Sequence, residues 1–195
     1  MSINGSAVDA VIAAGLCNGI ANAQSTGIGG GHFMLIYLKE KRKIYAIDAR
    51  ETAPMSTNKW TFRNTSSLVG GLSTAIPGEI YGFWRAHILG GKLAWSTLFQ
   101  PAIQMCRNGF KVSQVLAFSI KRAENHIRDS KELSNVFINP LTNETYKEND
   151  YIKMPKLAET LELISKTNIN EFYNGKLAQT MVNEINENGL SNLFF

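Results

Sequence analysis

The sequence predicts an α+β fold with a helix-rich C-terminal half. Two apolar runs, residues 33–38 and 43–49, flank a charged cluster, a pattern typical of two antiparallel strands joined by a solvated turn. Apolar residues at helical spacing, such as Leu157, Leu161 and Ile164, occur mainly after residue 76. Because the only clear hairpin is antiparallel, a layered αββα arrangement is favoured over a doubly wound parallel sheet.

The first helix is predicted over about residues 7–22. Ser6 can cap its N-terminus, and Asp9 stands three residues on, as in a capping box. The body of the helix is small and apolar on nearly every face, so we expect it to be buried on several sides. A glycine-rich loop, residues 25–31, then leads into the hairpin.

A polar loop follows the hairpin, and we expect Trp60 and Phe62 to anchor it. The next helix opens at Pro77, because proline suits the first helical position, and ends at the glycine pair 90–91. The remaining segments are predicted as helices over about residues 94–107, 112–128, 154–166 and 176–186, with a turn over 139–144.

Composition excludes several classes of protein. The 195 residues are 44% hydrophobic and 18% charged, which is ordinary for a chain that forms a core. The net charge of +4 is not gathered in a basic patch, so we expect no nucleic-acid partner. No apolar run is long enough to span a membrane. Cys17 and Cys106 are predicted to be buried thiols, and no histidine or cysteine spacing indicates a metal or another cofactor.

The glycine-rich loop has several interpretations. Binding of a nucleotide is disfavoured because His32 stands where a dinucleotide fingerprint needs glycine, and because the helix precedes the loop and the strand follows it. The loop then serves close backbone packing or lines a substrate pocket. Ser25, Thr26 and His32 could suggest nucleophilic catalysis, but no Gly-x-Ser-x-Gly elbow is present.

Arg50 is the strongest candidate for binding. It follows the second apolar strand, and a guanidinium matches a carboxylate in bidentate geometry, so Arg50 could hold an acidic ligand. The alternative is a structural ion pair with Glu51 or Asp48. Separately, Asn64 and Asn143 lie in predicted loops and begin N-glycosylation acceptor sequences, whereas the acceptor at Asn4 adjoins a capped helix and is less plausible.

Five motifs, in this order and spacing, resemble those of the γ-glutamyltransferase (glutathione hydrolase) family. They are residues 5–10 (GSAVDA), 25–31 (STGIGGG), 50–54 (RETAP), 77–79 (PGE) and 100–103 (QPAI), and residues 172–175 (FYNG) are similar to a later family motif. The resemblance implies a partial αββα sandwich of the N-terminal nucleophile hydrolase type. It also implies that residues 1–195 are an incomplete portion of the large subunit.

The resemblance assigns one substrate contact to this chain. The arginine of the Arg-Glu-x-Ala-Pro motif, here Arg50, would bind the α-carboxylate of the γ-glutamyl group, with Glu51 in support. The family nucleophile is the N-terminal threonine of a small subunit cut from the same precursor. No Thr-Thr-His or Thr-Ser-His occurs here, so we expect no catalytic residue in this chain.

The implied activity is hydrolysis of glutathione or transfer of its γ-glutamyl group to an amino acid or peptide. The implied partners are a γ-glutamyl substrate and the small subunit, and the implied location is the outer face of the plasma membrane or the extracellular space. The alternative is a truncated, non-catalytic copy that binds γ-glutamyl compounds or pairs with another subunit. A nucleotide-binding enzyme that uses the glycine loop is the remaining hypothesis.

Overall fold

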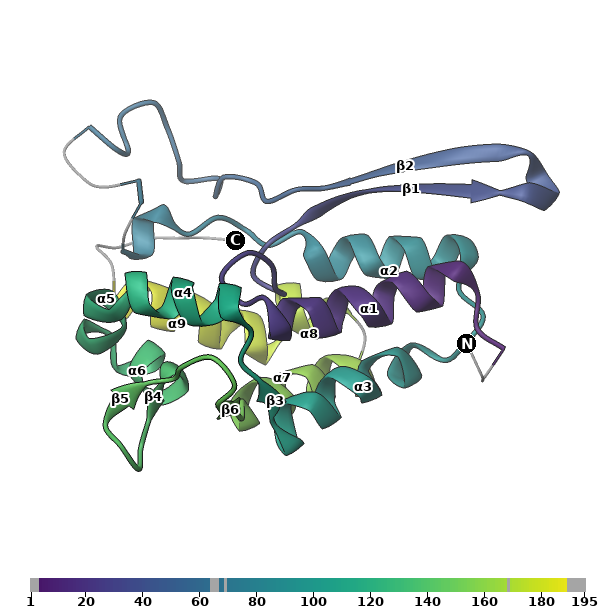
Figure 1. The fold of residues 1–195 in the computed structure, drawn as a ribbon. Helices are drawn as coiled ribbons and strands as arrows, with labels where there is room; N and C mark the ends of the chain where they lie inside the picture. The colour runs from purple at the N-terminus through teal and green to yellow at the C-terminus, as the bar shows by residue number, and fades with distance from the viewer. Residues whose placement is uncertain (1–3, 64–66, 69, 168, 189–195) are drawn as a thin grey trace. The chain divides into compact units, whose positions relative to one another are not determined.

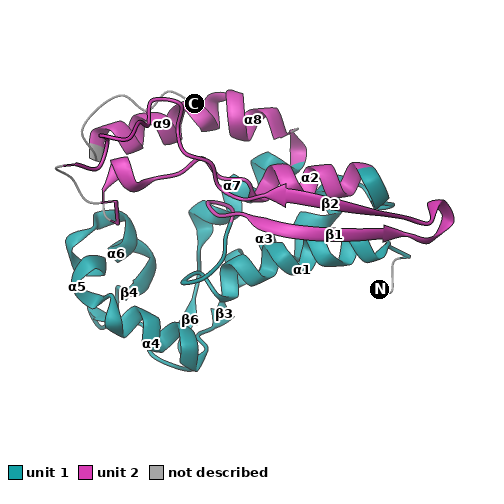
Figure 2. Ribbon diagram, turned by 90° about the horizontal axis from the view of Figure 1, so that it is seen from above, with its two compact units in different colours: residues 1–27, 89–165 teal, residues 28–88, 166–195 magenta. Residues whose placement is uncertain are grey.

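The computed structural model describes residues 4–63, 67–68, 70–167 and 169–188. The chain divides into two compact units (Figure 2). The helical unit contains residues 1–27 and 89–165, and the hairpin unit contains residues 28–88 and 166–195. Helices and antiparallel strands are mixed, and helices predominate in the C-terminal half, so the predicted α+β class is confirmed.

The hairpin unit is built on strands β1 (His32–Leu38) and β2 (Lys43–Ala49) (Figure 1). They pair antiparallel from His32↔Ala49 to Leu38↔Lys43, as the two apolar runs predict. A short 3₁₀ turn, η1 (Lys39–Lys41), and Arg42 in the left-handed region, at φ 49°, reverse the chain. The charged cluster is therefore a hairpin turn.

One face of the hairpin is apolar and exposed. Phe33, Leu35 and Tyr37 alternate along β1, and Ile44 lies opposite Tyr37 on β2. These four residues are 72%, 75%, 61% and 70% exposed, respectively. Because side chains alternate across a strand, the four share one face, while Ile36 and Ala49 are buried on the other. We call these four residues the apolar hairpin face.

Four further elements complete the hairpin unit: η2 (Gly71–Ser73), α2 (Glu79–Gly90), α8 (Ile169–Asn174) and α9 (Lys176–Asn188). Helix α9 packs against α8 and η2. The prediction that Trp60 and Phe62 anchor the preceding loop is wrong, because both rings are exposed. Lys59 and Arg63 instead place their cations over the Trp60 ring, 4.8 and 5.2 Å from its centroid.

Helices α1 (Ala7–Ala21) and α3 (Trp95–Asn108) pack together in the helical unit. The predicted capping box is present, because Ser6 Oγ accepts from Asp9 N and an Asp9 carboxylate oxygen accepts from Ser6 N. The buried positions of α1 include a single stripe of Val8, Ile12, Leu16 and Ile20. Val11 is 51% exposed, so the expectation of burial on several sides is wrong for that face.

Asp9 is also tied to a distant part of the helical unit. Its carboxylate accepts from the backbone N–H groups of Lys92, at 3.2 and 3.0 Å, and Leu93, at 3.2 Å. Burial by itself raises the pKa of the Asp9 carboxyl. Hydrogen bonds from Ser6, Lys92 and Leu93 outweigh burial, so the pKa is lowered overall. The carboxylate therefore joins the start of α1 to the segment before α3.

The single helix predicted over residues 112–128 is wrong. The structure has α4 (Gln114–Arg122) and α5 (Glu124–Asp129), which meet at Ala123, and then α6 (Lys131–Phe137). Two short antiparallel pairs and one helix complete the unit: β3 (Phe110–Lys111) with β6 (Tyr151–Ile152), β4 (Ile138–Asn139) with β5 (Glu144–Thr145), and α7 (Pro155–Lys166).

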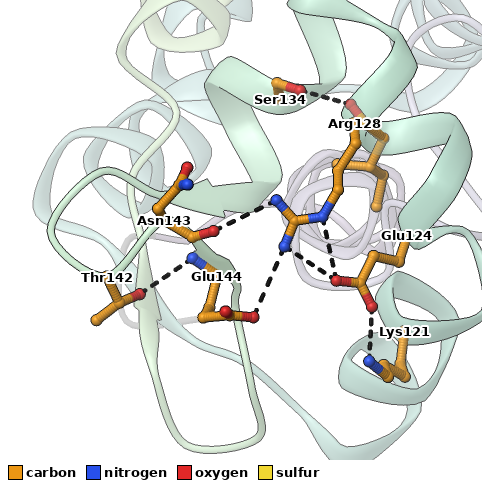
Figure 3. Close-up of polar contacts among 8 residues, drawn as sticks. Lys121, Glu124, Arg128, Ser134, Thr142, Asn143 and Glu144 are labelled. Atoms are coloured by element: carbon orange, nitrogen blue, oxygen red, sulfur yellow. Dashed lines mark hydrogen bonds and ion pairs between the residues drawn. The ribbon is translucent and has the colours of Figure 1, made fainter.

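The turn predicted over residues 139–144 is confirmed as the β4–β5 connection, and Arg128 of α5 holds it (Figure 3). The Arg128 guanidinium donates to the Asn143 carbonyl at 3.3 Å and lies 3.6 Å from a Glu144 carboxylate oxygen. It also pairs with Glu124, at 3.0 Å, and Glu124 in turn accepts from Lys121. All these groups lie at the surface, so the network orders the turn more than it stabilises the unit.

Both cysteines are free and belong to the helical unit. Cys106 of α3 is buried, as predicted, and burial together with the nearby Cys17 raises the pKa of its thiol to about 11. Cys17 of α1 is half-buried, and burial raises the pKa of its thiol as well. Since the thiolate is the reactive form, both thiols are poor nucleophiles at neutral pH.

Candidate functional site: an exposed arginine on a clamped main chain

Arg50 stands directly after β2, at the end of the hairpin where β1 begins. Its side chain is 53% exposed, and Nη2 lies 3.1 Å from Oε2 of Glu51. Its backbone N–H donates to Oδ1 of Asp48 at 3.1 Å. The ion pair that the sequence offered as an alternative therefore exists. It does not exhaust the guanidinium, which carries five N–H donors, so much of the fork remains open to a second carboxylate.

The main chain at Arg50 packs closely against two glycines. A Cβ on Gly31 would come within 2.2 Å of the Ala49 carbonyl oxygen and 2.9 Å of Arg50 Cα. A Cβ on Gly78 would come within 2.2 Å of the same oxygen and 2.8 Å of the Arg50 carbonyl oxygen. Both glycines are thus required by close backbone approach. We call this arrangement, Gly31 and Gly78 packed against the main chain of residues 49–50, the Arg50 slot.

Hydrogen bonds tie the two walls of the slot together. The Gly30 carbonyl accepts from Gly78 N at 2.9 Å and from Glu79 N at 3.0 Å, which joins the start of β1 to the start of α2. Beyond Arg50, Thr52 and Ile76 exchange backbone hydrogen bonds of 3.1 and 2.8 Å. The main chain is therefore fixed on both sides of Arg50.

A side-chain pair adds to this connection. His32, the first residue of β1, places Nδ1 3.0 Å from Oε2 of Glu79, the first residue of α2. The imidazole also stacks on Phe83, with ring centroids 4.6 Å apart. The other ring nitrogen, Nε2, is buried and has no hydrogen-bond partner among the described residues.

Tyr173 of α8 holds the start of α2 from another direction. Its hydroxyl donates to the Pro77 carbonyl at 2.9 Å and accepts from Tyr81 N at 3.2 Å. Burial raises the pKa of the Tyr173 hydroxyl to about 12, so it remains protonated and able to donate at neutral pH. The FYNG and PGE motifs thus meet in the hairpin unit through a hydrogen-bonded hydroxyl.

The other sequence candidates take separate places. Thr26 Oγ1 accepts from Asn18 at 3.3 Å, while His32 contacts Glu79, so neither contact indicates nucleophilic catalysis. Asn143 is exposed in a left-handed turn at φ 57°, and its use as a glycosylation acceptor stays a prediction. Asn64 lies outside the described residues.

The sequence did not predict the structural contacts that His32, Glu79 and Tyr173 make. His32 is 47 residues from Glu79, and Tyr173 is 96 residues from Pro77, so no local pattern could have paired them. The one available signal was that the PGE and FYNG motifs both occur in the sequence.

The described residues lack both a metal-binding cluster and a membrane-spanning helix. No three His, Cys, Asp or Glu side chains gather there in a way that could hold a metal ion. Within the same ranges, no helix has both the length and the apolar character needed to cross a bilayer.

Comparison with known proteins identifies the family. A sequence profile described as gamma-glutamyltranspeptidase matches residues 1–193, and the chain belongs to this family. It is 46% identical over 187 residues to Scoloptoxin SSD14 of Scolopendra dehaani, a match that covers 95% of this chain and 32% of that protein. It is 40% identical over 192 residues to Glutathione hydrolase proenzyme 1 of Schizosaccharomyces pombe, covering 97% and 30%.

Solved structures agree with the sequence relatives. The γ-glutamyltranspeptidase of Helicobacter pylori matches with a TM-score of 0.89 at 28% identity, over 97% of this chain and 56% of that one. The Pseudomonas nitroreducens enzyme, complexed with L-DON, gives 0.85 at 31% identity, over 98% and 57%. These matches confirm the predicted N-terminal nucleophile hydrolase fold class. The chain spans about a third of the two sequence relatives, 32% and 30%.

Proposed function

We propose that the complete protein hydrolyses glutathione and other γ-glutamyl compounds, or transfers the γ-glutamyl group to an amino acid or peptide. The observation that carries this proposal for the chain itself is Arg50. Its main chain is clamped in the slot, while its guanidinium is half-exposed and pairs, among the described residues, with Glu51 alone. A fixed main chain that presents an open guanidinium suits the binding of a ligand carboxylate better than it suits a structural ion pair.

In this proposal Arg50 binds the α-carboxylate of the γ-glutamyl group, and Glu51 orients the guanidinium from the side. The reacting amide lies at the far end of the glutamyl chain. Binding energy from the carboxylate therefore serves to position that amide rather than to alter its chemistry. Within the described residues, the chain contributes binding and no nucleophile of its own.

The bond-breaking step belongs to the rest of the protein in this proposal. The N-terminal threonine of a small subunit attacks the γ-glutamyl amide, with its own amine as the base, and backbone N–H groups stabilise the oxyanion. The amine leaves with a proton and a glutamyl ester remains on the threonine. Water or an acceptor amine then takes the glutamyl group and restores the hydroxyl.

We propose further that residues 1–195 are part of a large subunit, and that the small subunit covers the apolar hairpin face. Phe33, Leu35, Tyr37 and Ile44 expose a contiguous apolar surface on one side of the hairpin. Surfaces of this kind on a soluble protein mark sites of association. The relatives are about three times as long as the matched segment, which leaves enough chain to supply such a cover.

For location, we propose the outer face of the plasma membrane or the extracellular space, with Asn143 and Asn64 as glycan acceptors. Asn143 supports this, because it lies exposed in a turn. Expression of the complete protein in a eukaryotic secretory host should give a band that N-glycosidase shortens, and Asn143→Gln should remove part of that shift. A band of unchanged mobility in both proteins would contradict the proposal.

The proposed activity is tested with the complete protein and a γ-glutamyl anilide. We expect Arg50→Ala to lower kcat/KM roughly ten- to hundredfold, since hydrogen bonds to a charged group contribute about 1.5–3 kcal/mol. Arg50→Lys should recover only part of this loss, because lysine cannot form the bidentate pair. Arg85→Ala, which removes an exposed cation from α2, is the matched control and should leave turnover unchanged.

Two outcomes would redirect the proposal. Turnover that Arg50→Ala leaves unchanged would remove Arg50 from the site. A complete protein that binds glutamate through Arg50 but turns nothing over would favour the non-catalytic alternative.

A further inference from the structure

We infer that His32 is a positioning residue for Arg50, acting through its contact with Glu79. This inference rests on the proposed role of Arg50 in binding the γ-glutamyl carboxylate. The His32–Glu79 pair would set where the guanidinium is presented, and so how well that carboxylate is bound. Neither residue needs to touch the substrate for this role.

The main chain of Arg50 places its guanidinium. The Arg50 side chain has one ion-pair partner among the described residues, Glu51, which is its neighbour in sequence and moves with it. Its position therefore follows from the main chain at residues 49–50. That main chain is gripped by Gly31 and Gly78, with no room for a Cβ on either wall. Any separation of the walls would shift Arg50 directly.

Hydrogen bonds hold the two glycine segments of the slot together. Three hydrogen bonds link the start of β1 with the start of α2: two reach the Gly30 carbonyl, and the third joins His32 to Glu79. The first two are backbone contacts, which substitution of a side chain cannot remove. The third is a side-chain contact, which a substitution at His32 or Glu79 can remove without changing the glycines.

The imidazole of His32 lies against α2. A Cβ on Gly82 would lie 2.7 Å from Cε1 and Nε2 of His32 and 2.4 Å from Cβ of Ala49. His32 and Ala49 are also partners across the hairpin. The ring and the Ala49 side chain thus both lie against α2 at Gly82, and Ala49 is the residue before Arg50.

The two ring nitrogens of His32 distinguish a positioning contact from simple core packing. The His32 Nε2 atom is buried and has no hydrogen-bond partner in the described part of the chain, which costs free energy that an apolar side chain would avoid. That cost is smallest when Nδ1 carries the proton, donates to Glu79, and leaves Nε2 as a bare acceptor. An apolar side chain of similar size would serve packing alone. The Nδ1 contact with Glu79 is therefore the feature that distinguishes histidine at this position.

The test measures kcat/KM for a γ-glutamyl anilide with the complete protein, corrected by active-site titration. His32→Leu keeps the bulk but removes the donor, and we expect a fall of about three- to tenfold per active molecule, within the range of coupled neighbours. His32→Asn places an N–H donor near the Nδ1 position and should restore kcat/KM to within about twofold. In an Arg50→Ala background, His32→Leu should have no further effect.

Each result decides between the two proposals. If Arg50→Ala leaves kcat/KM unchanged, the proposed function fails first. If Arg50→Ala has its effect but His32→Leu has none, or has the same effect with and without Arg50, the positioning role is overturned and His32 is structural. Should His32→Leu yield no folded protein, Glu79→Gln replaces it. It keeps an acceptor of the same shape and should give a smaller fall that again vanishes with Arg50→Ala.

Discussion

Asp9 and Arg50 are both charged residues within family-like motifs, yet their surroundings are opposite. Asp9 is 2% exposed, and its carboxylate accepts N–H groups from Ser6, Lys92 and Leu93 within the helical unit. Arg50 has a clamped main chain but a half-exposed guanidinium whose ion-pair partner, within the described ranges, is Glu51. A buried charge that is hydrogen-bonded within the protein stabilises the fold. A charged side chain on a fixed main chain, with hydrogen-bond donors still open, can bind a ligand.

The largest expected effect on stability comes from breaking the slot itself. Gly31→Ala would place a Cβ 2.2 Å from the Ala49 carbonyl oxygen, so the backbone must separate. We expect a loss of more than about 3 kcal/mol, only partly offset by the lower chain entropy of alanine in the unfolded state. Urea unfolding of the complete protein measures it, together with loss of turnover.

Gly29→Ala is the matched control for that substitution. A Cβ on Gly29 would meet nothing within 4 Å, and this glycine does not adopt a left-handed φ. Its unfolding midpoint should equal or slightly exceed that of the unchanged protein. Equal destabilisation by the two alanines would contradict the existence of a slot.

An intermediate effect is expected for Asp9→Ala. The change leaves the N–H groups of Lys92 and Leu93 without their acceptor and removes the capping box, at a cost of about 2 kcal/mol. Because the folded-state pKa of Asp9 is lowered, its contribution is complete above the unfolded pKa of roughly 4 and is lost as pH falls through the folded value. The difference between the two proteins should therefore shrink in acid.

Unfolding at neutral pH and at about pH 3 measures that difference. Asp129→Ala removes an exposed acid from the same unit and is the control, with no expected change. A stability difference for Asp9→Ala that stayed constant down to acid pH would mean that the ionised carboxylate is not the stabilising group.

The smallest effect on stability is expected for Arg50→Ala. An exposed ion pair contributes about 0.2–1 kcal/mol, so loss of the contact with Glu51 should barely move the unfolding midpoint. The same substitution should have a large effect on turnover. A destabilisation as large as that of Asp9→Ala would instead make Arg50 a structural residue.

Local signals predicted part of the fold well. Ser6 and Asp9 form a capping box within four residues, and the hairpin is specified by two apolar runs and a charged turn, so both could be read from the sequence. The break between α4 and α5 at Ala123 could not be read from the sequence, because no glycine or proline marks it. Ser130 caps a further helix, α6, beyond α5. The exposed ring of Trp60 was mistaken for an anchor because aromatic residues are often buried.

The candidate site, like the fold, has a local part that the sequence predicts and a non-local part that it does not. Arg50 and Glu51 are adjacent and belong to a motif, so the sequence identifies them together. The walls that hold them come from residues 30–32 and 77–79, and pairing such distant segments needs the folded chain. Asp9 illustrates the same limit, since its cap is local but Lys92 lies 83 residues away.

The central claim is that Arg50 recognises the α-carboxylate of a γ-glutamyl group. The most direct measurement compares two anilides on the complete protein, γ-glutamyl and 4-aminobutyryl, which differ only in that carboxylate. We predict that the unchanged protein prefers the γ-glutamyl substrate by roughly ten- to hundredfold in kcat/KM, and that Arg50→Ala abolishes most of this preference. A preference that survives intact in Arg50→Ala would show that the carboxylate is bound elsewhere.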